Sequence, residues 1–180
     1  GNQIRRLLKA ASMSPLTELL LFSAARAELT SRVISPALEA NQVVVSDRFT
    51  DSTIAYQQFG RKLPTSAVQQ STLLSAQGIN PNLTILLDIP PEQALKRVQK
   101  FQMALPLDHH VDHEAGRVED EGQMRFENEP MAFHKRVRTG YKALVENEPD
   151  RWYVLDATQD KQILSQQVWE KVLGLLPLPH

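Results

Sequence analysis

The sequence predicts an α/β fold in which a parallel β-sheet is flanked by helices. Three short apolar runs, at 42–47, 83–88 and 151–156, each end on an aspartate, and stretches with helical spacing separate them. Continuous apolar runs are typical of strands buried on both faces, and strands that alternate with helices favour a parallel sheet. The chain has 180 residues, close to the size of one ordinary domain. We therefore expect a single domain over residues 1–180.

The composition excludes several classes of protein. Hydrophobic residues make up 42% and charged residues 23% of the chain, the balance of a globular protein. The 20 basic and 21 acidic residues give a formal charge of −1, which provides no global field for nucleic acid or a membrane. The absence of cysteine excludes disulfides, thiolate catalysis and cysteine zinc sites. Because the apolar runs are too short to span a bilayer and no secretory signal is visible, we expect a cytoplasmic protein.

The first part of the chain is predicted to be mainly helical. Residues 2–9 form a short helical pattern, and Ser14 and Pro15 indicate the start of a long helix that continues to about Glu39. Pro36 should bend or break the last part of that helix. The run 42–47 then predicts the first strand.

Helices are also expected between and after the other two strands. They are predicted at about 65–77, 92–100, 124–147 and 161–175. Residues 101–123 differ, because acidic residues, histidine and glycine dominate them and little periodicity is present. This composition predicts a loop or flap inserted between two helices.

Three aspartates are predicted at the carboxyl edge of the sheet, where ligands bind in open α/β folds: Asp47, Asp88 and Asp156. An aspartate at this position can also cap a helix or close a turn. Asp47 differs from the others because Arg48 follows it. A carboxylate beside a guanidinium could hold a Mg²⁺-bound phosphate and a second phosphate respectively, and a plain structural ion pair is the alternative.

Phe22 and Arg26 lie four residues apart on the long predicted helix and therefore share a face. A ring and a guanidinium on one face could stack on a planar base and hydrogen-bond its edge. Phe22 could equally be a core residue.

The flap and the residues after it contain a second group of candidates. His109, His110 and His113 stand near carboxylates and could ligate zinc or nickel, although a solvated acidic loop would have the same composition. Four arginines of this region could reach transferring phosphates or could lie on a helix surface: Arg117, Arg125, Arg136 and Arg138.

In a series of motifs, and in the order in which they follow one another, the sequence resembles the bacterial type of thymidylate kinase. The similarity covers 17–27, 34–38, the Asp-Arg signature in 44–52, the Ala-Tyr-Gln of 55–57, and segments 86–92, 125–127 and 133–141. It implies a P-loop nucleoside-monophosphate-kinase-like α/β fold. It also implies an enzyme of dTTP biosynthesis that uses ATP to phosphorylate dTMP to dTDP. It also implies a homodimer formed through the helix at 15–40.

The resemblance assigns an acceptor site to one set of residues. Phe22 would stack on thymine, Arg26 would bond its exocyclic oxygen, and Tyr56 would pack under the deoxyribose. The other assigned residues are Arg48 on the monophosphate, Asp47 beside Mg²⁺ and the reacting phosphates, and Ser52 and Gln57 completing the base and sugar contacts. Asp47 and Arg48 would act in catalysis.

The donor side follows from the same resemblance. The flap at 101–123 would be the lid over ATP, with Arg117 and Arg125 reaching the nucleotide and Arg125 acting in catalysis. Asp156 and Ala157 would lie near the adenine. One position departs from the family, which has an aspartate where this chain has Met124.

A larger departure concerns the start of the chain. The family opens with a strand and a glycine-rich phosphate loop, and the sequence begins after the turn that would follow them, so about 50 residues are expected to be absent. Because phosphoryl transfer depends on such positioning, we expect the parent protein to be a kinase and the 180-residue chain alone to be inactive. The alternative is a non-catalytic deoxynucleotide-binding module.

Overall fold

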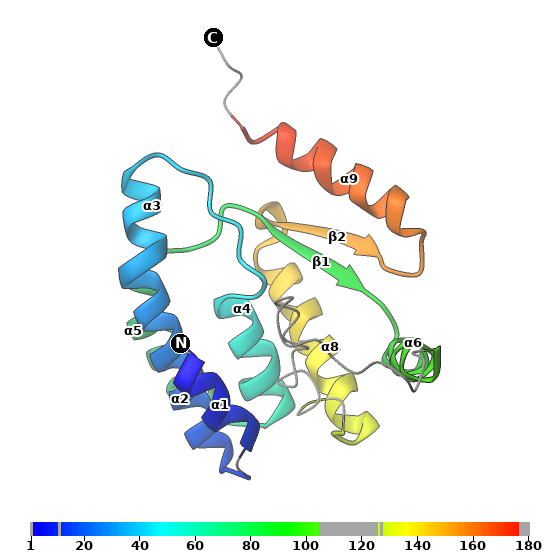
Figure 1. Ribbon diagram of the computed structural model, residues 1–180, viewed down its shortest axis with the longest axis horizontal. Coiled ribbons are helices and arrows are strands. Elements are labelled where there is room, and N and C mark those ends of the chain that lie inside the picture. Colours follow the sequence, from blue (N-terminus) through cyan, green and yellow to red (C-terminus); the bar gives the residue numbers. More distant parts are fainter. Residues whose placement is uncertain (1, 11, 105–125, 127, 177–180) are drawn as a thin grey trace, which may run out of the picture.

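The computed structural model describes residues 2–10, 12–104, 126 and 128–176 (Figure 1). Its helical elements are α1 (Asn2–Ala10), α2 (Pro15–Leu29), η1 (Thr30–Ile34), α3 (Ser35–Glu39), α4 (Thr50–Thr53), η2 (Ile54–Gly60), α5 (Thr65–Ala76), α6 (Pro91–Ala104), α8 (Met131–Asn147), η3 (Pro149–Arg151) and α9 (Lys161–Leu173). Its strands are β1 (Thr84–Asp88) and β2 (Trp152–Asp156). The alternation of strands and helices confirms the predicted α/β class.

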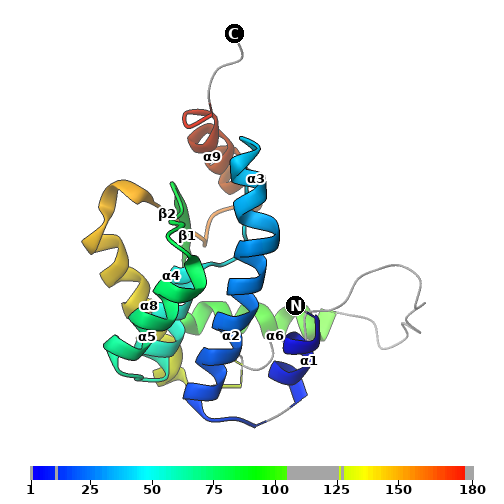
Figure 2. The same ribbon diagram turned by 90° about the vertical axis from the view of Figure 1, so that its left-hand side faces the viewer.

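The long predicted helix is present as α2, η1 and α3, which follow one another without a break (Figure 2). Ser14 caps its start by accepting a hydrogen bond from the Thr17 amide, and Pro15 occupies the first turn as predicted. The helix does not break at Pro36, although proline lacks an N–H and crowds the preceding turn. Instead the chain widens into a π-helical turn just before it, in which the Ser35 amide bonds the Thr30 carbonyl.

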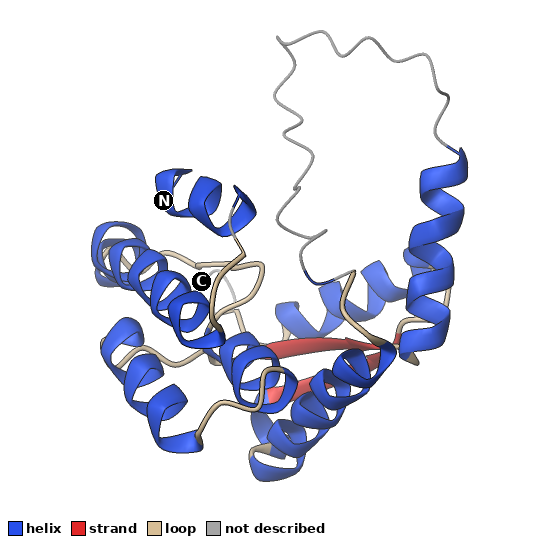
Figure 3. Ribbon diagram, turned by 90° about the horizontal axis from the view of Figure 1, so that it is seen from below, coloured by secondary structure: helices blue, strands red, loops and turns tan. Residues whose placement is uncertain are grey.

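Two of the three predicted strands form the sheet. β1 and β2 pair in parallel, with Thr84 opposite Trp152 and Asp88 opposite Asp156. Figure 3 shows the two strands among the surrounding helices. The register brings both aspartates to the carboxyl edge of the sheet, as the sequence predicted.

The strand predicted at 42–47 is not formed, which corrects the sequence-based expectation. Within the described part of the chain the sheet has two strands, β1 and β2, and neither pairs with this segment. Val43 and Val45 are exposed, Val45 by 92%. An apolar run becomes a strand only when a neighbouring strand takes its backbone hydrogen bonds, so apolar content alone does not specify one.

The helical segment at 50–60, formed by α4 and η2, was not predicted. Its second part is π-helical, with the Arg61 amide bonded to the Tyr56 carbonyl. α8 packs against η2, and glycines allow the close approach. A Cβ on Gly60 would lie 2.7 Å from the ring of Phe133, and one on Gly140 would lie 2.8 Å from the ring of Phe59.

The remaining helices match the predicted segments with shifted ends. α5 and α9 lie within one or two residues of the expected positions, whereas α8 begins only at Met131, after Pro130. α6 continues to Ala104, so the first four residues assigned to the flap are helical. The rest of the flap lies outside the described residues. No helix in the described ranges has the length and apolar character needed to cross a bilayer.

Candidate functional site

Arg48 stands at the junction between the 42–47 segment and α4 in a conformation unusual for its residue type. Its φ is 73°, in the left-handed region that non-glycine residues rarely adopt, and the Ser46 hydroxyl donates to its carbonyl at 2.8 Å. The guanidinium carbon lies 4.8 Å from the centre of the Tyr56 ring. Backbone strain of this kind persists where the surroundings fix it, and it gathers at functional sites.

Tyr56 belongs to a cluster of aromatic rings between α2, η2 and α8. Its ring meets Phe126 edge-on with centres 4.8 Å apart, and Phe126 lies nearly parallel to Phe133 at 5.9 Å. The Phe22 ring of α2 stacks on Phe126, with ring centres 6.3 Å apart and an interplanar angle of 22°. The structure thus places Phe22, Tyr56 and Arg48 in one aromatic region, linked through Phe126. Flat rings with a cation beside them suit a planar, anionic ligand.

Ser52 reaches this region through Tyr141 of α8. The two hydroxyl oxygens are 2.8 Å apart, and the Tyr141 ring packs edge-on against Tyr56. Burial raises the pKa of Tyr141 to about 12, so the phenol keeps its proton at neutral pH.

Arg26 lies on α2 as predicted, and its guanidinium turns toward the segment that follows Arg48. It donates to the Phe49 carbonyl at 3.2 Å and to the Thr53 hydroxyl, and to Ser75 on α5 at 3.2 Å. Burial lowers the pKa of Arg26 to about 10, which leaves the group charged at neutral pH. Arg26 therefore ties the Asp-Arg segment to α2 and α5.

Two buried acidic residues support the site, and the sequence did not indicate either role. Asp51 receives both terminal nitrogens of Arg151, at 2.8 and 2.9 Å. Glu18, which marked only a helix start in the sequence, accepts hydrogen bonds from Gln57 and Arg61. Their cationic partners are 100 and 43 residues away in the chain, so local patterns carry no signal for these pairs.

The carboxyl edge of the sheet carries the other predicted aspartates. Asp88 forms a two-pronged ion pair with Arg138 at 2.7 Å in each arm, and the Arg138 hydrogen bonds lower the pKa of Asp88. The Asp156 side chain accepts from the Thr158 amide at 2.9 Å, a turn-closing contact that lowers its pKa. The Ala157 carbonyl accepts from Arg97 at 2.6 Å. Arg138 is therefore engaged in a structural pair.

Arg136 also has a structural partner, because its guanidinium donates to the Phe59 and Gly60 carbonyls at the end of η2. Asp47 is exposed at the end of the 42–47 segment, next to Arg48. In the described structure no contact joins Asp156 or Ala157 to the Arg48–Tyr56 group.

Several predicted residues lie outside the described part of the chain, namely Arg117, Arg125, His109, His110 and His113. Among the residues that are described, no group of three or more His, Cys, Asp or Glu could hold a metal ion.

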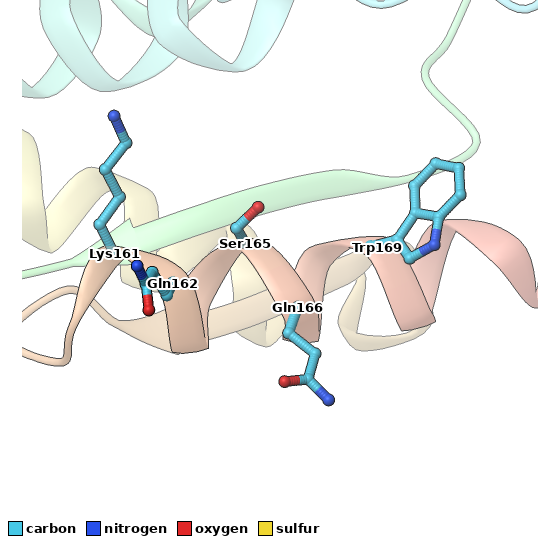
Figure 4. Close-up of a pocket in the computed structure, with 5 residues that line it drawn as sticks. All are labelled: Lys161, Gln162, Ser165, Gln166 and Trp169. Atoms are coloured by element: carbon cyan, nitrogen blue, oxygen red, sulfur yellow. The ribbon is translucent and has the colours of Figure 1, made fainter.

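A hollow of about 490 Å³ runs along α9, and none of the residues that line it belongs to the predicted site (Figure 4). It is lined by residues of that one helix: Lys161, Gln162, Ser165, Gln166 and Trp169. A wall contributed by a single helix face cannot enclose a ligand, so we assign no function to this hollow.

Comparison with known proteins identifies the family. The family model described as thymidylate kinase matches residues 1–109. The thymidylate kinase of Solidesulfovibrio magneticus is 42% identical over 179 residues, which are 98% of this chain and 80% of that protein. The chain belongs to the thymidylate kinase family. The thymidylate kinase of Geotalea uraniireducens is 41% identical to this chain, over 98% of this chain and 78% of its own length.

A solved structure agrees with this assignment to the thymidylate kinase family. The crystal structure of thymidylate kinase from Ehrlichia chaffeensis superposes with a TM-score of 0.67 and 26% identity, over 96% of this chain and 72% of that one. The fold expected from the resemblance is therefore confirmed, while the roles of individual residues stay predictions.

Proposed function

We propose that the protein transfers the γ-phosphoryl group of ATP to dTMP, giving ADP and dTDP. The observation that carries this proposal is the Arg48 guanidinium lying over the Tyr56 ring at 4.8 Å, beside the Phe22–Phe126 ring pair. One region thus combines a cation for a phosphate with flat walls for a base and a sugar. Membership of the thymidylate kinase family supports the choice of substrates.

In the proposed acceptor complex, Phe22 stacks on the thymine ring and the charged Arg26 bonds its exocyclic oxygen. Tyr56 packs against the deoxyribose, and its ring, in contact with the sugar, leaves no room for a 2′-hydroxyl. Ser52, held by Tyr141 at 2.8 Å, and the buried Gln57 complete the polar contacts. Arg48 then receives the monophosphate, because a guanidinium matches phosphate oxygens with two parallel hydrogen bonds.

Asp47 fits a Mg²⁺ ion held by the two nucleotides. Mg²⁺ keeps most of its water and is usually bound through one or two carboxylates plus substrate phosphates. An exposed carboxylate next to the phosphate-binding Arg48 meets that requirement. When bound there, the ion would neutralise charge on the phosphates.

In the proposed transfer, an oxygen of the dTMP phosphate attacks the γ-phosphorus of ATP in line with the leaving oxygen. The new O–P bond forms as the bond from the γ-phosphorus to the β,γ-bridging oxygen breaks, and ADP leaves with the electron pair. Arg48 holds the attacking phosphate and compensates its charge. We place the adenine at the edge of Asp156 and Ala157, and we assign Arg117 and Arg125 to the donor phosphates, with Arg125 acting in catalysis.

The first test is calorimetric titration with dTMP and with thymidine, alongside a dTMP-dependent ADP-release assay on the protein expressed from its whole gene. We expect R48M to weaken dTMP binding about 100-fold, the loss of a charged hydrogen-bonded pair, and to leave thymidine binding unchanged. The control R32M removes an arginine that is 76% exposed and should change neither. An unmodified protein that binds no dTMP, or an R48M variant that weakens both ligands equally, would refute the assignment.

The homodimer expected from the resemblance is part of the same proposal. Leu16 and Leu20 lie one turn apart on the long helix and are 50% and 56% exposed, so they form an apolar patch that a second copy would cover. Analytical ultracentrifugation should find a dimer that L20D converts to a monomer. The matched substitution L173D, at a leucine 46% exposed on α9, should leave the dimer intact. A monomeric unmodified protein would contradict the proposal.

A further inference from the structure

A carboxylate is buried directly behind the predicted base site. Glu18 is only 1% exposed and lies one helical turn before Phe22, on the same side of α2. Its Oε1 accepts from Gln57 Nε2 at 2.9 Å and from Arg61 Nε at 3.2 Å, and its Oε2 accepts from Arg61 Nη2 at 3.1 Å. A buried acidic group of this kind needs a reason beyond packing.

The carboxylate fixes the orientation of the Gln57 amide. An ionised carboxylate can only accept hydrogen bonds, so Gln57 must present its NH₂ group to Glu18. The reversed amide would set its oxygen against the Glu18 Oε1, two acceptors with no proton between them. The Gln57 carbonyl oxygen therefore points away from Glu18, and among the described residues no donor is bonded to it. Gln57 is 2% exposed, so its side chain is held in place and that oxygen is a fixed acceptor.

Arg61 holds the carboxylate in place from the other side. Its side chain is 16% exposed, bonds Glu129 as well as Glu18, and lies 5.5 and 5.0 Å from the centres of the Phe126 and Phe133 rings. These contacts raise the pKa of Arg61 against the effect of its burial. Among the described residues, Gln57 and Arg61 thus hold Glu18 from two sides and keep its carboxylate against the amide.

We propose that Glu18 is a positioning residue that sets which pyrimidines the site accepts, an inference that rests on the proposed function. With its carbonyl oxygen as the free group, Gln57 accepts the ring N–H of thymine or uracil. Arg26, which only donates, matches the carbonyl beside that N–H. Cytosine carries an acceptor ring nitrogen and a donor amino group at these positions, so both contacts would be repulsive. Glu18 thereby excludes cytosine without touching the nucleotide.

The test measures binding of dTMP, dUMP and dCMP by calorimetry to the unmodified protein, to E18Q and to E129Q. E18Q keeps the size of the side chain but allows either amide orientation at Gln57. We expect the preference for dTMP over dCMP to fall about tenfold, the worth of one buried polar contact, while the dTMP-to-dUMP ratio stays unchanged. E129Q removes the other carboxylate partner of Arg61 and should leave both ratios unchanged.

The double variant E18Q/Q57E makes the test decisive even if E18Q alone folds poorly. It restores a donor–acceptor pair with the carboxylate on the base side, which accepts in any orientation, so the preference against dCMP should return. An unchanged preference in E18Q, an equal loss for all three nucleotides, or a double variant that still accepts dCMP would overturn the inference. If the unmodified protein binds none of the three, the proposed function fails instead, and the inference fails with it.

Discussion

Replacing Arg151 by methionine is the sharpest test of how the Asp-Arg segment is held. Arg151 lies just before β2, and its two terminal nitrogens bond the two oxygens of Asp51 at 2.8 and 2.9 Å. One of these nitrogens also bonds the Thr84 hydroxyl at 2.7 Å, so the guanidinium joins α4 to the start of both strands. The side chains of Arg151 and Asp51 are only 15% and 8% exposed.

The expected magnitude follows from what remains after the substitution. Removing one member of a buried ion pair typically costs about 3–5 kcal/mol, because the other charge is left buried without compensation. Thr84 still donates to Asp51 at 3.0 Å, which places R151M at the lower end, about 3 kcal/mol. The contact of Arg151 with the Trp152 ring at 5.1 Å contributes about 0.5–1 kcal/mol more.

Urea unfolding followed by circular dichroism measures this change in the free energy of unfolding. E148Q, which removes an exposed partner of the same arginine, should cost less than about 1 kcal/mol. The double variant D51N/R151M should be more stable than R151M alone, because both charges leave together. Strictly additive single effects, or an R151M variant within about 0.5 kcal/mol of the unmodified protein, would show that this pair does not hold the segment.

Two further predictions concern α8. Because Arg138 lowers the pKa of Asp88 below its ordinary 3.8, Asp88 adds stability above pH about 4–5 that is lost as the pH falls through the lowered value. The free energy of unfolding of D88N should therefore be lower than that of the unmodified protein by a constant amount near neutrality, and the difference should shrink in acid. A difference that does not change with pH would refute the pairing. G140A should lower the free energy of unfolding by about 1–2 kcal/mol, because its Cβ would lie 2.8 Å from the Phe59 ring. The control G174A, whose Cβ would lie 3.6 Å from the Lys171 carbonyl oxygen, should be close to neutral in the same urea titration.

The sequence predicted those elements whose signals are local. α2, α5 and α9 have helical periodicity or defined caps, such as Asp160, whose side chain accepts from the Gln162 amide. The prediction of a strand at 42–47 was wrong because a strand forms only beside a neighbouring strand, and the pattern of its own residues does not show whether that neighbour is present. The helix at 50–60 was missed because its second half is π-helical and lacks the 3.6-residue period on which the prediction relied.

The residues of the candidate site also differ in whether their signals are local. Phe22 and Tyr56 could be predicted from motif and spacing, and the structure brings them to the same aromatic cluster through Phe126. Glu18 and Asp51 could not, because their roles depend on arginines far along the chain. From the local pattern alone, a charged residue within an amphipathic helix is predicted to lie on the surface or to mark the start of the helix.

These long-range pairs explain how a segment with few apolar residues can carry a precise site. The segment from Arg48 to Arg61 has a small apolar core around Ala55, Phe133 and Val137. Polar contacts from three other elements, α2, α8 and η3, fix the rest: Arg26 to the Phe49 carbonyl, Arg151 to Asp51, Tyr141 to Ser52, Glu18 to Gln57 and Arg61, and Arg136 to the Gly60 carbonyl. Apolar packing sets a distance, whereas each hydrogen bond also sets a direction. A segment held in this way can keep an arginine in the left-handed region and an amide in one orientation, and the discrimination between bases proposed above requires both.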